Sequence, residues 1–240
     1  YKLPDFSGDK WTKIIAPYTD LSPAVAGGYK TANSYIVSAA GDYKFRATHK
    51  GNSSTEAIGA ITSAAVLWES FGTATAPAVG DLVKNVAYSD GYIRFTATAA
   101  EGNAVIAVID DKGTDGTEDD VILWSWHIWL TDQPAEHVYN NSAGTMMDRN
   151  LGATSATPGD VGALGLLYQW GRKDPFLGSS AISGYNVAKS TITWPGKVGS
   201  SAETGTIAYA VTHPTTFISN ADEYSNRDWY YTGDNTTDNT

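Results

Sequence analysis

The sequence predicts a mainly β protein, with a β-sandwich in its first half and a loop-rich α+β module in its second. Short runs of β-branched and aromatic residues recur between turn residues up to residue 131. After residue 131 the composition shifts, and residues 173–240 are rich in loops. The chain also has eight Trp, fourteen Tyr and 24 Gly, and 18% of its residues are charged, whereas about a quarter is usual for soluble domains. This mixture is typical of short strands joined by tight turns.

About seven or eight short strands are predicted in the first half, and seven of them are placed by residue. They are 34–38, 43–48, 64–69, 83–88, 92–98, 104–109 and 121–129. Residues 43–48 and 92–98 alternate between apolar and polar side chains, the period-2 pattern of a half-buried strand. Residues 104–109 are a continuous apolar run, as in a buried strand. Seven strands with regular turns favour an immunoglobulin-like sandwich, which we assign to residues 31–131.

The regions on either side are predicted from their turn residues and helical spacing. Residues 1–30 are rich in proline, which prevents long helices, so we expect a lead-in arm or an edge strand. Residues 132–240 form the loop-rich module. Its best helix candidate starts at 157–160 and ends at Gly171. Partial helical spacing supports this helix at Val161, Leu164, Leu167, Tyr168 and Trp170. A second short helix is expected within 220–229.

Charge and residue usage exclude several function classes. The formal net charge is −10, and such a surface repels nucleic-acid backbones and anionic membranes. The chain has no cysteine, so it offers no disulfide, thiol nucleophile or thiolate metal site. No apolar run approaches the roughly 18 residues of a membrane helix. Because the chain begins with Tyr1 rather than Met, we expect a mature or trimmed form of an exported protein.

Long aromatic segments resemble a group of Bacteroidales cell-surface proteins, the fimbrillin-like and pilus-tip proteins. The matching segments are 33–38, 41–45, 102–108, 122–129, 147–153 and 165–176. The second half resembles the Fibrobacter succinogenes major paralogous domain. That resemblance implies a C-type-lectin-like fold for residues 132–240, and a location on the outer membrane, on a fimbria or outside the cell.

Two departures separate this sequence from that group. An acidic insertion, 110–120, replaces the short turn that members usually have before the Trp-rich strand. Members also usually continue beyond an Asp-Asn-Thr stretch into a segment that contains Cys-Pro, which does not follow here. We therefore expect a piece of a longer protein, with a truncated lectin-like half.

The acidic insertion is a candidate calcium site. Calcium prefers six to eight oxygen ligands on a flexible loop that contains glycine. The candidate ligands are Asp111, Asp115, Glu118 and Asp120. Their spacing does not match the twelve-residue EF-hand loop. The alternative is a solvated hairpin tip between two hydrophobic strands.

Two further groups are candidates for ligand binding. Trp124 and Trp126 share one face of a strand, where indoles can stack on sugar rings; the alternative is packing in a core or between domains. Arg149 and Asn150 can bind a polar ligand or hold the loop before the helix. Arg172 can do the same, or it can complement a helix C-terminus while the neighbouring Trp170 packs inward.

Patterns of enzymatic chemistry are weak, so we predict that the chain is not an enzyme. It has no Gly-x-Ser-x-Gly elbow, dinucleotide fingerprint or phosphate loop. Its four histidines lie far apart in the sequence. We expect a surface adhesin or fimbrial-tip component that binds a glycan or a surface protein. Two alternatives are a pilus subunit that assembles by strand addition and a carbohydrate-binding module attached to a glycan hydrolase.

Overall fold

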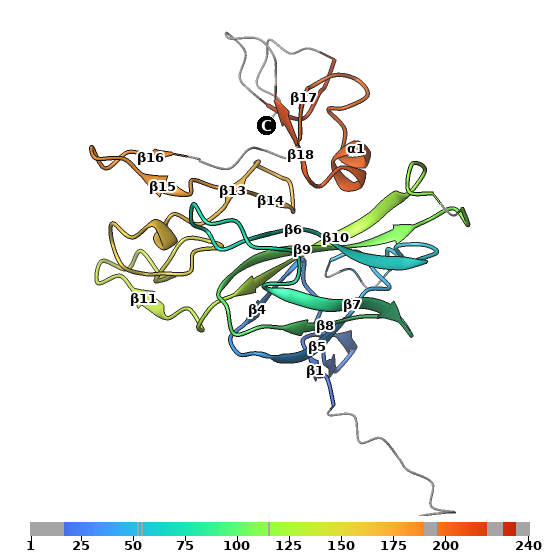
Figure 1. Cartoon of the computed structure of the whole chain (residues 1–240), viewed down its shortest axis with the longest axis horizontal. Helices are drawn as coiled ribbons and strands as arrows, with labels where there is room; N and C mark the ends of the chain where they lie inside the picture. Colours follow the sequence, from blue (N-terminus) through green and yellow to red (C-terminus); the bar gives the residue numbers. More distant parts are fainter. Residues whose placement is uncertain are drawn as a thin grey trace, which may run out of the picture.

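The computed structural model describes residues 17–51, 53, 55–114, 116–189, 196–219 and 228–233. It confirms the mainly β fold class. Two four-stranded sheets dominate the molecule (Figure 1). The first has the order β1-β5-β8-β7, formed by Thr19–Asp20, Gly41–Arg46, Tyr92–Ala97 and Val83–Ser89. The second has the order β4-β10-β9-β6, formed by Ser34–Val37, Val121–Leu130, Gly102–Asp110 and Ser63–Ser70. All seven strands predicted from the sequence are present.

The two sheets pack face to face around one hydrophobic core. Every second residue of β8 points inward, which places Ile93 and Phe95 in this core. The ring of Phe45 lies 4.9 Å from that of Tyr35 and 5.2 Å from that of Trp126, between ring centroids. These aromatic contacts cross from one sheet to the other, so the inward-facing side chains of both sheets form a single core.

One edge of each sheet is formed by a segment near the N-terminus. β1 pairs with β5 in parallel over two residues, and β4 pairs with β10 in parallel over four. Ala24–Val25 (β2) and Gly28–Tyr29 (β3) form a small antiparallel pair beside them. The part of the predicted arm that the structure describes therefore folds back onto its own chain, and residues 1–16 lie outside the described residues.

The strands of the second half form short pairs, joined by long loops. They are β11 with β12 (Glu136–Val138, Thr145–Met147), β13 with β14 (Leu167–Tyr168, Pro175–Phe176), β15 with β16 (Ala181–Ile182, Ala188–Lys189) and β17 with β18 (Gly196–Gly199, Thr216–Ser219). The α-helix α1 spans Ile207–Thr212 and the 3₁₀ helix η1 spans Val161–Ala163. This half lies against the outer face of the sheet that contains β10 (Figure 1). Among the described residues, no helix is long and apolar enough to cross a membrane.

The helix predicted to end at Gly171 is wrong. The structure has the three-residue η1 and the strand β13 in its place. Gly165 explains the difference, since its φ of +72° is left-handed and a Cβ there would lie 2.6 Å from the carbonyl oxygen of Leu151. A continuous helix cannot pass through this residue. The helix expected within 220–229 falls almost entirely outside the described residues.

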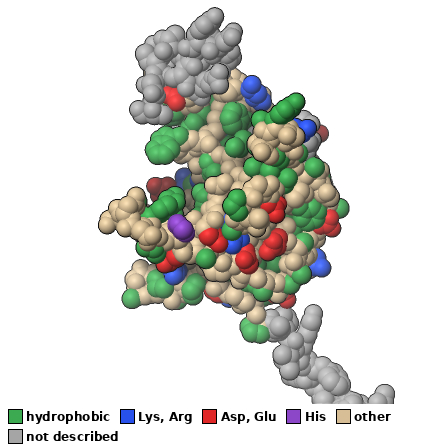
Figure 2. Space-filling view, turned by 90° about the vertical axis from the view of Figure 1, so that its left-hand side faces the viewer, with side chains coloured by type: hydrophobic (Ala, Val, Ile, Leu, Met, Phe, Trp, Pro, Cys, Tyr) green, Lys and Arg blue, Asp and Glu red, His purple; other side chains and the backbone are tan. Residues whose placement is uncertain are grey.

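The surface agrees with the acidic composition. On the face in Figure 2, acidic side chains are scattered among polar ones, and hydrophobic side chains gather in places at the edge. The exposed hydrophobic residues include Val138 and Met146 of the β11–β12 pair, together with Trp170 and Tyr185. Trp170 is 84% exposed, so the prediction that it packs inward is wrong.

Candidate functional site

The outer face of β9 and β10 carries polar and aromatic side chains that bind the second half of the chain. The indole Nε1 of Trp129 donates to the carbonyl oxygen of Ala153 at 3.0 Å. The amide of Asn103 donates to the carbonyl oxygen of Gly152 at 2.8 Å. Both side chains are buried, so these bonds lie inside the contact between the two halves.

His127 lies beside these bonds and is 3% exposed. Its Nε2 is 2.9 Å from Oδ1 of Asn103, and its Nδ1 is 2.9 Å from the hydroxyl oxygen of Ser34. Asn103 uses its NH₂ group for Gly152, so its oxygen accepts from Nε2 and the Ser34 hydroxyl donates to Nδ1. Burial lowers the pKa of His127 to about 3. Such a histidine is neutral at pH 7 and is a weak base, which is consistent with a structural role.

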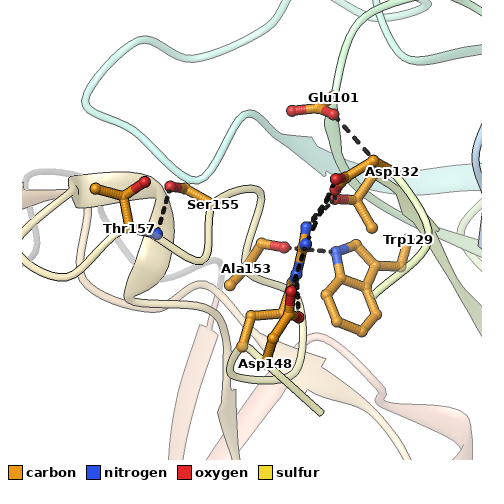
Figure 3. A network of polar contacts seen from close by, with 9 residues as sticks. Glu101, Trp129, Asp132, Asp148, Ala153, Ser155 and Thr157 are labelled. Atoms are coloured by element: carbon orange, nitrogen blue, oxygen red, sulfur yellow. Dashed lines mark hydrogen bonds and ion pairs between the residues drawn. The ribbon is translucent and has the colours of Figure 1, made fainter. Parts of the chain in front are cut away.

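Arg149 is the centre of a second polar network, which includes Asp132 and Asp148 (labelled in Figure 3). Its Nε donates to Asp148 at 2.8 Å, and its Nη1 donates to Asp132 and, at 3.1 Å, to the hydroxyl of Thr131. These bonds raise the pKa of Arg149 and lower the pKa of both carboxyl groups. The neighbouring Asn150 donates to the carbonyl oxygen of Ala163 at 3.0 Å. Both predicted ligand-binding residues are therefore engaged within the chain, which favours the loop-holding alternative.

A pocket of about 160 Å³ lies where β10, α1 and the segment 171–174 meet, and we call it the Trp124–Trp229 pocket. Its polar and aromatic lining residues are Asn33, Trp124, Arg172, Lys173, Asp174 and Trp229. Ile207, Ala210 and Val211 of α1 and Gly171 complete the lining. The pocket thus combines two indoles with charged and amide groups, the kind of lining that fixes a small polar ligand.

Trp124 lines the pocket because of its position on β10. β4 pairs with β10 only from His127 to Leu130, so Trp124 lies beyond the end of β4. Its Nε1 donates to Oδ1 of Asn33 at 3.2 Å. The ammonium group of Lys173 is 4.5 Å from the centroid of the ring, within cation–π distance.

Trp126 has a different environment, although it shares a strand face with Trp124. It is 1% exposed and packs against Phe45 between the sheets. A ligand cannot reach it, so the predicted ligand-binding role of Trp126 is corrected to core packing. The same alternation places Trp124 against the edge of this core while part of it faces the pocket.

Lys173 and Asp174 form a buried ion pair in the wall of the pocket. The Nζ of Lys173 lies 2.7 Å from Oδ1 of Asp174 and 2.5 Å from Oγ of Ser125, whose hydroxyl donates to the same carboxylate at 2.6 Å. The Lys173 ammonium also donates to the backbone carbonyl of Ser125 at 3.1 Å. Burial lowers the pKa of Lys173, against the opposing effect of Asp174. The two opposite charges neutralise each other within the wall.

Arg172 is 8% exposed and has neutral partners. Its Nη1 donates to Oε1 of Gln169 at 2.7 Å and to the carbonyl oxygen of Thr216 at 2.8 Å. Its Nη2 donates to the carbonyl oxygens of His213 at 3.2 Å and Ala210 at 3.4 Å, at the C-terminus of α1. Arg172 therefore complements a helix C-terminus as predicted, but the helix is α1 rather than the expected one.

The acidic insertion joins β9 to β10. Asp111 accepts a bond from the backbone N–H of Gly113 at 2.9 Å, and Asp119 accepts one from Thr114 at 2.8 Å. Asp115 lies outside the described residues. In the described part of the chain, no group of three or more acidic or histidine side chains is placed to hold a metal ion. Calcium binding by Asp111, Asp115, Glu118 and Asp120 stays a prediction.

Of the five predicted ligand-binding residues, the structure brings Trp124 and Arg172 into one pocket. Sequence reasoning missed Asn33, Trp229 and the α1 residues, which are far apart along the chain and carry no shared motif. The one signal in the sequence for these residues was the high number of tryptophans.

Comparison of the chain with protein-family models, with curated proteins and with solved structures gives no match.

Proposed function

We propose that this protein is a non-enzymatic cell-surface binding protein, an adhesin or fimbrial-tip component, that holds a glycan in the Trp124–Trp229 pocket. The pocket itself carries the proposal. The apolar face of a pyranose ring packs well on an indole, and the amide and charged groups around it suit sugar hydroxyls. A volume of about 160 Å³ is small beside drug-sized sites of roughly 300–1,000 Å³, so it suits a single ring of a longer glycan. The cell-surface location rests on the sequence resemblance and composition.

The strand order supports an immunoglobulin-like assignment for the paired sheets. In that fold the second, fifth and fourth strands lie together in one sheet, and the seventh, sixth and third lie together in the other. With β4 as the first strand, β5-β8-β7 and β10-β9-β6 have this order. A C-type-lectin-like second half rests on the sequence resemblance alone.

The pocket gives less support to a glycan hydrolase. Hydrolysis of a glycosidic bond usually needs two carboxyl groups on either side of the bond. Among the described residues that line the pocket, the carboxylate is that of Asp174, and it is held by Lys173 and Ser125. Binding without turnover is the chemistry that this lining favours.

A broad glycan array, run in calcium and again in chelator, tests the proposal. We expect binding to a defined set of glycans. Loss of binding in chelator would assign the ligand to the acidic insertion, whereas binding in both buffers would agree with the pocket. An array without any bound glycan would overturn the glycan-binding function.

Matched variants locate the binding site on the molecule. Ile207 is 64% exposed at the rim of the pocket, so Ile207→Trp narrows the pocket without burying new surface in a core. Val79 is 96% exposed and lies outside the pocket, which makes Val79→Trp the control. We expect the first variant to lose binding and the second to bind like the wild-type chain.

A second candidate function is assembly by strand addition. β1 covers only Tyr43 and Lys44 of β5, so most of that sheet edge is unpaired among the described residues. β1, β2 and β3 form strand pairs within the chain, so residues 1–16 are the candidate arm. Light scattering of the chain with and without residues 1–16 tests this function. Concentration-dependent oligomers that the deletion abolishes would support it, and a monomer at all concentrations would exclude it.

A further inference from the structure

The charges around the Trp124–Trp229 pocket do not balance. The ion pair between Lys173 and Asp174 is neutral as a unit. The ion pairs of the described residues do not include Arg172. Arg172 and Lys173 together exceed the single negative charge of Asp174, so the lining carries a net positive charge. This charge lies in a chain whose formal net charge is −10. The pocket is therefore a local exception to an acidic protein.

Among the described residues, the hydrogen-bond partners of Arg172 include no carboxylate. Four acceptors contact its Nη atoms, and all four are neutral carbonyl or amide oxygens. Its Nε is buried and has no hydrogen-bond partner among the described residues. Burial also lowers the pKa of Arg172, because a desolvated cation is costly, and Asp174 opposes this effect. Arg172 lines the pocket, so an anionic group bound there would lie near its guanidinium and would add a negative charge beside it.

We infer that the pocket is specific for a glycan residue that carries a carboxylate, a hexuronic acid, whose acid group lies near the positive charge of Arg172. This inference rests on the proposed glycan-binding function and names the ligand class for the same pocket. The indoles of Trp124 and Trp229 contact the sugar ring. The guanidinium of Arg172 lies 5.7 Å from the Trp229 ring, so the cation and one aromatic wall are close enough to contact a single ring.

A pair of sugars that differ at C6 alone tests the inference. Methyl β-D-glucuronide and methyl β-D-glucoside are titrated into the full chain by calorimetry or NMR at low salt. We expect the glucuronide to bind at least about tenfold more tightly, the scale of one attractive charge–charge contact near a protein surface. Acetate, the acid group without a ring, is expected to bind far more weakly than either. Equal affinity for acetate and the glucuronide would overturn the assignment to a sugar.

Substitutions at the pocket rim test the charge without disturbing the buried Arg172. Ile207 is the first residue of α1, where an acidic side chain is compatible with the helix. Relative to Ile207→Gln, Ile207→Glu is expected to lower the ratio of glucuronide to glucoside affinity about three- to tenfold, by repulsion of the acid. Val79→Glu adds the same charge outside the pocket and is expected to leave the ratio at its wild-type value.

The outcomes separate this inference from the proposed function. Equal binding of both methyl glycosides, or a ratio unchanged in Ile207→Glu, would overturn the acid preference and leave glycan binding intact. If neither methyl glycoside binds while the array shows glycans whose binding Ile207→Trp abolishes, the acidic subsite is wrong and the function stands. An array without any bound glycan would overturn both the acid preference and the glycan-binding function.

Discussion

His127 makes the stability of this protein depend on pH in a way that one substitution can isolate. Burial lowers its pKa to about 3 in the folded chain, against 6.5 for the ordinary side chain. The folded state therefore excludes a proton that the unfolded chain binds below pH 6.5. Stabilisation is complete above pH 6.5 and is lost progressively down to about pH 3. Each pH unit of difference is worth about 1.4 kcal/mol, so the loss is about 2 kcal/mol at pH 5 and about 3 kcal/mol at pH 4.

Urea unfolding followed by Trp fluorescence measures this effect at pH 7.5 and pH 5.0. Carboxyl groups also titrate over this range, so the quantity of interest is the difference between two proteins. We expect the wild-type free energy of unfolding to fall about 2 kcal/mol more than that of His127→Gln, which cannot take up the proton. His137→Gln removes an exposed histidine and is expected to follow the wild type. Equal pH dependence of wild type and His127→Gln would refute the reasoning.

Two further predictions concern stability. Arg149→Gln removes charged hydrogen bonds to Asp132 and Asp148 and is expected to lower the free energy of unfolding by about 1–2 kcal/mol. The control, Lys112→Gln, lies at an exposed ion pair and is expected to change it by less than about 0.5 kcal/mol. Urea unfolding compares the two variants, and equal effects would contradict the stabilising role of the network in Figure 3. Gly165→Ala is expected to destabilise the protein more than Gly113→Ala. Both glycines have a φ of +72°, but only Gly165 has a carbonyl oxygen 2.6 Å from the new Cβ. Melting temperatures measure the difference, and a larger fall in melting temperature for Gly113→Ala would contradict this prediction.

The strands were predictable because a half-buried strand has its own two-residue period. The inward residues of β8, Ile93, Phe95 and Ala97, alternate with Tyr92 and Arg94, and this alternation is visible in the sequence. β9 was predictable for another reason. It is covered on both faces, by the other sheet and by the second half of the chain, so its buried run is continuous.

The predicted helix failed because spacing reports which face a side chain takes but not the backbone angle that a glycine adopts. Val161 and Leu164 fit a helix, yet the left-handed φ of Gly165 ends η1 and sends the chain into β13. No local pattern distinguishes this glycine from one tolerated inside a helix. The close approach to Leu151 that requires it is a tertiary contact.

The candidate site was predictable only in part. A strand face was assigned correctly to Trp124 and Trp126, but residues on one face meet different neighbours along the strand. Trp126 faces Phe45, whereas Trp124 lies past the end of β4 and reaches the pocket. Asn33 and Trp229 join it from nearly opposite ends of the chain, and sequence spacing carries no information about such a meeting.

Indole NMR signals test the central claim most directly. The Nε1–H resonances of the described tryptophans are assigned by Trp→Phe substitution and followed while the strongest glycan from the array is added. We predict that the signals of Trp124 and Trp229 shift with one common affinity, while that of Trp126, buried between the sheets, stays in place. Shifts confined to the exposed Trp170, or glycan binding that moves neither pocket indole, would contradict the account.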